Sequence, residues 1–265
     1  MDNSVPMSEF RLLPEQRFHR AIIDDDIQML QWLVGSKKVD DVCNRGADDN
    51  NWPSLMLAAR YGRLDIANYL LEIGHENEAT STDSKGNTVP MVSAKYKHED
   101  ICLTYLEKYP HTMSEVNRDG RSAINWAAQN GLNRVIEWIL SHGGNINQRD
   151  IDGNTPLHHA ASWNQYSIVT LLLERDAQIG LKNHKGYTAT EYAYSSSMEK
   201  HIGTTVSRLQ FKRQQALQKQ AGAFVTTATA MPRDSVDVMT TPPPTAVPVT
   251  EFPSKQVTLS PDHLQ

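Results

Sequence analysis

Histidines and acidic residues are the first candidates for chemistry in this chain of 265 residues, which contains ten histidines. Histidine serves both as a metal ligand and as a general acid or base near neutral pH. The adjacent pair His158-His159 cannot aim both rings at one metal from a helix, because successive helical residues diverge by about 100°. The run Asp24-Asp25-Asp26 lacks the other ligands of a calcium loop, so we expect a solvated turn between helices there.

Motifs of well-defined enzyme classes are missing from the sequence. It contains no His-Glu-x-x-His zinc motif, no Gly-x-Ser-x-Gly nucleophile turn and no glycine loop that would cradle a phosphate. Cys43 and Cys102 are far apart and have no second pair, so neither a disulfide framework nor a structural zinc site is indicated. We therefore expect a protein that is not an enzyme and that carries no cofactor or metal.

Charge and hydropathy narrow the range of partners and locations. A formal net charge of −5 gives no general attraction to nucleic acid or to an anionic membrane. The first residues lack the basic start and apolar core of a signal peptide, and no apolar run reaches the roughly 18 residues of a membrane helix. We expect a soluble cytoplasmic or nuclear protein that does not bind nucleic acid and associates with a membrane only indirectly.

The elements that position the remaining side chains follow a repeat. Gly120, Gly153 and Gly186 are spaced by 33 residues, and the pairs Ala127-Ala128 and Ala160-Ala161 have the same spacing. A period of this length indicates stacked structural units that each bury too little surface to be stable alone.

The clearest copy of the unit runs from Asp150 to Asn183. Gly153 suits a turn that needs positive φ, Thr155 can cap the helix that follows, and Pro156 then lies in the first turn, where no N–H partner is lost. Small and apolar residues spaced by three and four predict two antiparallel helices, with Leu157, Ala160 and Ala161 on the first and Val169, Leu172 and Leu173 on the second.

The segment Thr155-Pro-Leu-His-x-Ala160, at this period, resembles the ankyrin repeat. The resemblance implies an all-α ankyrin-repeat solenoid of about five to six helix-turn-helix units with β-turn fingers, followed by a disordered tail. It also implies that His158 satisfies backbone groups between neighbouring turns. We expect a flexible N-terminal segment at 1–15, the repeat domain at 16–216 and a low-complexity, Thr/Pro-rich tail at 217–265.

Some units depart from the clearest copy. The stretch Gln16–Val34 keeps only helical positions, as an N-terminal cap would. Asn51 replaces the turn glycine, and asparagine visits positive φ more readily than most residues. Pro90 replaces a helical leucine, but it falls in the first turn, where a helix tolerates it. In the last unit Thr190-Glu191 replaces the Leu-His pair, and its final helix is predicted to continue to about Lys219.

Large aromatic and cationic side chains recur at two positions that the repeat does not use for its own core. One position lies two residues after the alanine pair, and the other directly follows the turn glycine. Tyrosine, tryptophan and arginine are enriched at interface hot spots. We therefore predict a partner-binding groove on the concave side, formed by Trp52, Tyr61, Tyr96, Arg121, Trp163 and Tyr187. The alternative is that each ring packs on its neighbour's turn, as we expect of Trp126 and Trp138 within the helices.

Two features outside the repeat core allow weaker interpretations. The basic stretch Arg208–Lys219 is either a solvated helix face or a contact for acidic lipid or an acidic partner. Thr241 and Ser260 each precede a proline, as proline-directed kinases require, and are predicted phosphorylation sites.

Several departures from the generic repeat resemble a narrower group, the ankyrin-repeat accessory subunits of fungal TOR complex 2. They are Arg17-Phe-His-Arg-Ala-Ile-Ile, Asn51-Trp52, Ala59-Arg-Tyr-Gly-Arg, Leu71-Glu-Ile-Gly-His-Glu and Lys85-Gly-Asn-Thr. This resemblance implies a non-catalytic subunit that binds the scaffold and kinase subunits of a complex acting at the plasma membrane. The alternative is an ankyrin-type regulator of transcription factors or of a phosphatase.

Overall fold

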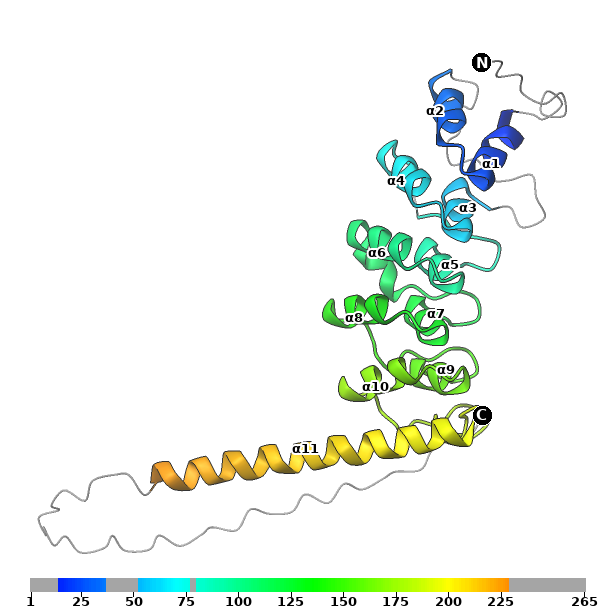
Figure 1. The fold of residues 1–265 in the computed structure, drawn as a ribbon. Helices are drawn as coiled ribbons and strands as arrows, with labels where there is room; N and C mark the ends of the chain where they lie inside the picture. Colours follow the sequence, from blue (N-terminus) through cyan, green and yellow to red (C-terminus); the bar gives the residue numbers. More distant parts are fainter. Residues whose placement is uncertain (1–13, 37–51, 77–79, 229–265) are drawn as a thin grey trace, which may run out of the picture. The chain divides into compact units, whose positions relative to one another are not determined.

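A computed structural model describes residues 14–36, 52–76 and 80–228, and helices dominate these segments (Figure 1). The prediction of an all-helical repeat array is confirmed. The helices are α1 (Pro14–Asp24), α2 (Ile27–Gly35), α3 (Ser54–Tyr61), α4 (Leu64–Glu72), α5 (Val89–Lys95), α6 (Glu99–Lys108), the 3₁₀ helix η2 (Pro110–Ser114), α7 (Ala123–Asn130), α8 (Asn133–Ser141), α9 (Pro156–Ser162), α10 (Tyr166–Glu174) and α11 (Ser196–Ala228). The chain divides into two units at residue 216, and the description below concerns the described residues of the first.

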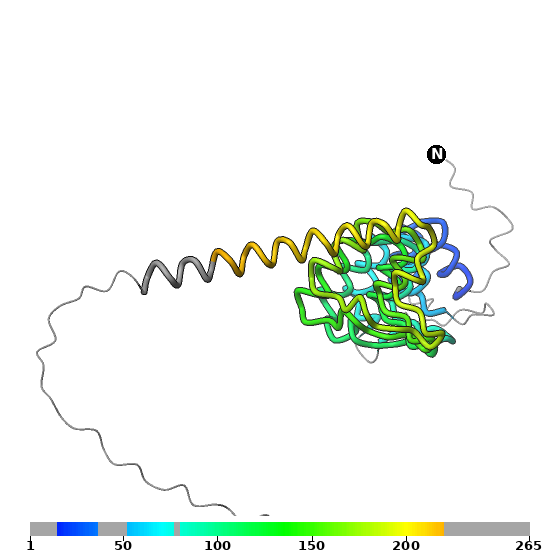
Figure 2. The backbone as a smooth tube through the Cα atoms, turned by 90° about the horizontal axis from the view of Figure 1, so that it is seen from below, coloured from blue at the N-terminus to red at the C-terminus, as the bar shows by residue number. Residues whose placement is uncertain are grey.

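Consecutive helix pairs stack within this unit. The first helices pack in the order α1, α3, α5, α7 and α9, and the second helices α4, α6, α8 and α10 pack in the same order beside them. Viewed along the stack, the pairs lie behind one another (Figure 2). Each helix has seven to eleven residues from α1 to α10, too few to be stable in water alone, so the neighbours supply its stability.

The buried side chains form two clusters that meet in the pair α5–α6. Val92 and Tyr105 belong to the cluster that continues toward α1, whereas Met91 and Leu106 belong to the cluster that continues toward α11. This pair therefore gives one buried face to each neighbour, and its Pro90 lies in the first turn of α5, as predicted.

Within residues 80–228 four β-turn fingers follow the helix pairs, and each is organised by one carboxylate or amide side chain. The Oδ1 atom accepts the backbone N–H groups two and four residues further on, at 2.8–3.1 Å, which closes the turn. The four residues are Asp83, Asn117, Asp150 and Asn183. Backbone hydrogen bonds of 2.8–3.0 Å then join each finger to the next, as from Ile151 N–H to Asp119 O.

A glycine at each finger tip has positive φ, but the room beside it differs. At Gly120 an added Cβ would lie 2.9 Å from the nitrogen of Ile151 in the next finger, whereas at Gly186 no described atom lies within 4 Å. Gly186→Ala should cost about 1–2 kcal/mol of unfolding free energy through positive-φ strain. Gly120→Ala should cost more, because the fingers must also separate. Urea unfolding of both variants measures the difference, and equal losses would contradict the close finger packing.

The two ends of the array differ from the prediction. Helix α1 begins at Pro14, two residues before the expected boundary of the repeat domain, and Asn51 lies outside the described residues. In the last unit, residues 189–192 form turns instead of a first helix. Its second helix, α11, runs to Ala228, past Lys219, because Ala, Gln, Leu and Lys are good helix formers.

Candidate partner-binding surface

His158 has the structural role predicted for it. Its Nδ1 accepts the backbone N–H of Thr155 at 3.2 Å, and its Nε2 then donates to the carbonyl of Tyr187 in the next unit at 3.1 Å. Burial lowers the pKa of His158 below its ordinary value by disfavouring the imidazolium. The neutral ring therefore ties the start of α9 to the finger that follows.

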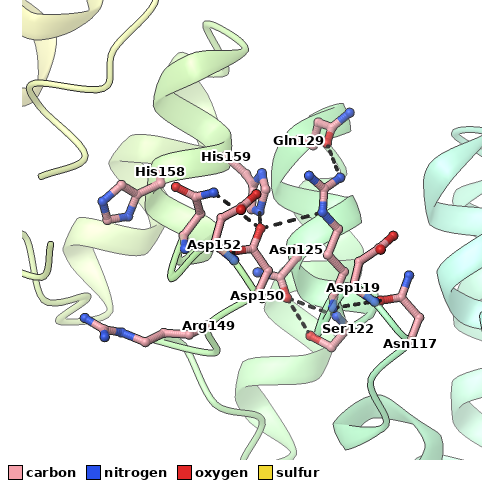
Figure 3. Close-up of polar contacts among 12 residues, drawn as sticks. Asn117, Asp119, Ser122, Asn125, Gln129, Arg149, Asp150, Asp152, His158 and His159 are labelled. Carbon is pink, nitrogen blue, oxygen red and sulfur yellow. Dashed lines mark hydrogen bonds and ion pairs between the residues drawn. The ribbon is translucent and has the colours of Figure 1, made fainter. Parts of the chain in front are cut away.

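His159 turns the other way, toward the carboxylate of Asp150 (Figure 3). Its Nε2 lies 2.9 Å from Oδ2 of Asp150, and Nε of Arg121 lies 3.6 Å from the same oxygen. Because the two histidines bind different groups, they share no site. Among the described residues no group of three His, Cys, Asp or Glu side chains is placed to hold a metal ion.

The Asp150 carboxylate makes the finger sensitive to acid. Burial alone would raise its pKa, but the hydrogen bonds from His159 and from the Asn154 N–H outweigh this effect and lower the pKa below the ordinary value. A carboxyl with a lowered folded-state pKa contributes stability above its unfolded pKa and loses it as pH falls through the folded pKa.

Unfolding of the Asp150→Asn variant tests this contribution. Asparagine is the natural residue at the equivalent positions 117 and 183 and keeps the turn acceptor. Below pH of about 4, the wild type should lose stability more steeply with falling pH than the variant does. Parallel curves in chemical unfolding at a series of pH values would contradict the role given to Asp150.

Three of the predicted binding residues, Trp52, Tyr61 and Tyr96, come together around Arg60. Trp52 is only 7% exposed and packs edge-on against Tyr96, with ring centroids 6.5 Å apart. The guanidinium carbon of Arg60 lies 5.0 Å from the Trp52 centroid and 5.5 Å from those of Tyr61 and Tyr96. These distances are within the range of cation–π attraction, so the rings hold the guanidinium in place.

The alternation of cation and ring continues into the next two units. Nζ of Lys95 lies 5.6 Å from the Tyr96 centroid and 5.2 Å from the Trp126 centroid. The guanidinium carbon of Arg121 lies 4.8 Å from the Trp126 centroid, so Trp126 contacts two cations. We name this set the cation–aromatic row; it consists of Trp52, Arg60, Tyr61, Tyr96, Lys95, Trp126 and Arg121.

Arg60 and Lys95 were not among the predicted binding residues. Both directly follow the small pair of a first helix, at Ala59 and Ala94, and that shared position is the signal that could have identified them. Trp126, expected to be a packing residue, is half-buried. It packs against the core cluster that continues toward α11 and also belongs to the row.

The other two predicted residues lie at the C-terminal end of the array and are open to solvent. Trp163 is 58% exposed where α9 ends, and Tyr187 is 49% exposed on the last finger. Tyr194, which the sequence interpretation missed, is 78% exposed, and its N–H donates to the carbonyl of Ala161 at 3.3 Å. It lies there because turns replace the first helix of the last unit.

The chain matches the family model described as ankyrin repeats (3 copies) over residues 18–114, 73–150 and 91–183. The chain belongs to the ankyrin-repeat family. The fingers and the paired helices described above are therefore the parts of consecutive ankyrin repeats.

Three relatives show what kinds of protein contain similar ankyrin repeats. The target of rapamycin complex 2 subunit AVO2 of Saccharomyces cerevisiae is 26% identical over 160 residues, which cover 60% of this chain and 37% of that protein. BCL-6 corepressor-like protein 1 of Homo sapiens is 28% identical over 125 residues, covering 47% and 7%. Palmitoyltransferase AKR1 of Lachancea kluyveri is 30% identical over 171 residues, covering 63% and 22%. This chain thus spans well under half the length of each.

Asparagines occupy some of the same ankyrin positions as the exposed rings, and they stabilise the fold. Asn87 accepts a hydrogen bond from Nδ2 of Asn117 at 2.8 Å, and Asn154 accepts one from Asn183 at 2.9 Å. Nδ2 of Asn130 donates to the carbonyl of Ala94 at 2.9 Å. At these two repeat positions, an asparagine therefore stabilises the contact between repeats, whereas a large ring can be exposed on the surface.

The remaining candidate groups are the basic stretch, the Cys102 thiol and the two predicted phosphorylation sites. Two charges of the basic stretch form ion pairs at or just after the end of α10, Arg208 with Glu174 at 3.2 Å and Arg213 with Asp176. Burial raises the pKa of the Cys102 thiol to about 12, which disfavours a reactive thiolate. Thr241 and Ser260 lie outside the described residues. Among the described helices, none is long and apolar enough to cross a membrane.

Proposed function

We propose that this ankyrin-repeat protein is a non-catalytic accessory subunit of TOR complex 2 that binds the scaffold and kinase subunits. The observation that carries the proposal is the 26% identity to the yeast complex subunit over 60% of this chain. Ankyrin repeats form extended surfaces suited to protein–protein interaction, and this role requires no catalytic group.

The binding surface that we propose consists of the six residues predicted from the sequence. Trp163 and Tyr187 offer large exposed rings with a polar atom, which suits contact with a partner. Tyr61, Tyr96 and Arg121 are partly exposed within the cation–aromatic row. Trp52 takes part indirectly, because its buried ring supports Arg60 and Tyr96 from behind.

Complex membership also determines the location that we propose. The protein is cytoplasmic and peripheral at the plasma membrane, which it reaches through its protein partners. The tail residues Thr241 and Ser260 remain proposed sites of proline-directed phosphorylation, and mass spectrometry of the native protein tests them.

A second candidate is an ankyrin-type regulator of transcription factors or of a phosphatase. The 28% identity to a human corepressor-like protein favours the first of these. That match covers less of this chain than the yeast subunit does, 47% against 60%, so we prefer the TOR complex.

Affinity purification from native cells with quantitative mass spectrometry distinguishes the candidates. The tagged protein should enrich the TOR kinase and its scaffold over an untagged control strain. Enrichment of DNA-binding factors or of a phosphatase, with the kinase at background level, would favour the second candidate and overturn the first.

A further inference from the structure

Two cations of the cation–aromatic row, Arg60 and Lys95, have no acidic partner in the part of the chain that the structure describes. The carboxylate nearest to Arg121 is Asp150, at 3.6 Å, and it is already bonded to His159. Arg60 and Lys95, in two consecutive repeats, are therefore not neutralised by a described carboxylate, and Arg121 in the next repeat shares its carboxylate with His159.

The rings hold these cations without using their hydrogen-bonding capacity. A ring face attracts a cation through its quadrupole, but it does not accept the N–H groups as a carboxylate does. The described residues provide no hydrogen-bond acceptor for Arg60 or Lys95, and Arg121 donates one long bond of 3.4 Å to Gln129. All three side chains are half-buried, so their heads are already positioned and partly desolvated. Groups fixed in this way lose little entropy when an acceptor arrives.

We propose that the cation–aromatic row binds an extended acidic segment of a protein partner, with carboxylates on Arg60, Lys95 and Arg121 and apolar side chains on the rings between them. This inference rests on the proposed function, because it assigns a chemistry to part of the same surface. The attraction is local, since the whole chain carries a net charge of −5.

The spacing of the row fits such a peptide. Packed helices lie roughly 8–10 Å apart, and an extended chain advances about 3.3 Å per residue, so every third residue meets a new repeat. The line of alternating rings and cations favours a peptide over an anionic membrane, which would contact a broad field of exposed charges instead.

Fluorescence anisotropy with the full chain tests the proposal. The probe is a fluorescein-labelled extended peptide of about nine residues, long enough to span three repeats, with glutamate at every third position and leucine and serine between. The matched control probe has glutamine in place of glutamate. We expect binding of the glutamate probe only, and weaker binding as salt rises, because salt screens partly exposed charges.

Charge variants link the binding to the row. The double variant Arg60→Gln/Lys95→Gln should bind the glutamate probe about tenfold more weakly, as expected for two partly exposed ion pairs. Arg60→Lys keeps the charge and should retain most of the binding. Arg175→Gln removes an exposed cation at the end of α10 and serves as the control, and thermal unfolding verifies that each variant is folded.

Three results would overturn the proposal: no binding of the glutamate probe, equal binding of the glutamine probe, or unchanged binding by the double variant. Preference for phosphatidylserine vesicles over the peptide would also overturn it. Capture of native partners by the same variants distinguishes failure of the acidic-segment proposal from failure of the proposed binding function. If the double variant captures partners normally while Trp163→Ala does not, the acidic-segment proposal falls and the proposed binding function stands.

Discussion

Leu172→Ala is expected to lower the free energy of unfolding by about 2–5 kcal/mol, because truncation of a fully buried leucine leaves a cavity that its neighbours cannot fill. Leu172 lies on α10 with no exposed surface, inside the cluster that joins the last repeats to α11. Since each repeat is stabilised by its neighbours, the loss should be concentrated at the C-terminal end of the array.

Hydrogen exchange of the variant locates the effect. Amides of α9 and α10 should lose protection, whereas those of α3 and α4 should change little. Leu171→Ala is the matched control, because Leu171 is adjacent but only partly buried, and its cost should be clearly smaller. Equal costs at the two positions would contradict the packing described for α10.

Glu76→Ala is the second variant with a large expected effect, about 3–5 kcal/mol, because it removes a buried charged acceptor and leaves its buried donors unpaired. Oε2 of Glu76 accepts the Tyr105 hydroxyl at 2.9 Å and the Ser81 N–H at 2.8 Å, and Oε1 lies 3.2 Å from Nδ1 of His75. Nε2 of His75 in turn accepts the N–H of Leu55 at 3.3 Å, which places the proton on Nδ1.

The pKa shifts of Glu76 and Tyr105 agree with an ionised Glu76 carboxylate at the centre of this network. Burial would raise the pKa of Glu76, but the hydrogen bonds from His75, Ser81 and Tyr105 lower it below the ordinary value. Burial and the neighbouring carboxylate raise the pKa of Tyr105, so its hydroxyl remains a donor.

Tyr105→Phe provides the control for Glu76→Ala. It removes one donor and leaves Glu76 its other partners, so the cost should be about 1–3 kcal/mol, the range for one hydrogen bond to a charged group. Urea unfolding monitored by circular dichroism measures both variants. A Glu76→Ala variant as stable as Tyr105→Phe would show that the network does not hold the second and third helix pairs together.

The repeat itself was predictable from local sequence. Gly153, Thr155, Pro156 and the alanine pairs each have a backbone or packing reason that acts within a few residues, and the structure places them as expected. Pro90 was predicted correctly for the same reason, because its effect depends only on its place in the first helical turn.

The cation–aromatic row was not predictable in the same way. Arg60 meets Tyr96, and Lys95 meets Trp126, only because consecutive repeats stack, so the contacts depend on distances between units rather than on the period. The bond between Glu76 and Tyr105 likewise joins residues of different repeats. The burial of Trp52 also depends on the stack, since Tyr96 of the next repeat covers its ring.

Capture of native partners by a Trp163→Ala/Tyr187→Ala variant, quantified by mass spectrometry, tests most directly whether the exposed rings of the repeat array bind a partner. Phe211→Ala is the control, because Phe211 is 60% exposed and lies on α11, outside the proposed surface. The Trp163→Ala/Tyr187→Ala variant should keep the wild-type melting temperature. Its capture of partners should fall about thirtyfold, as expected when hot-spot residues that contribute about 2 kcal/mol to binding are removed. Wild-type capture by this variant, or an equal loss with Phe211→Ala, would contradict the account.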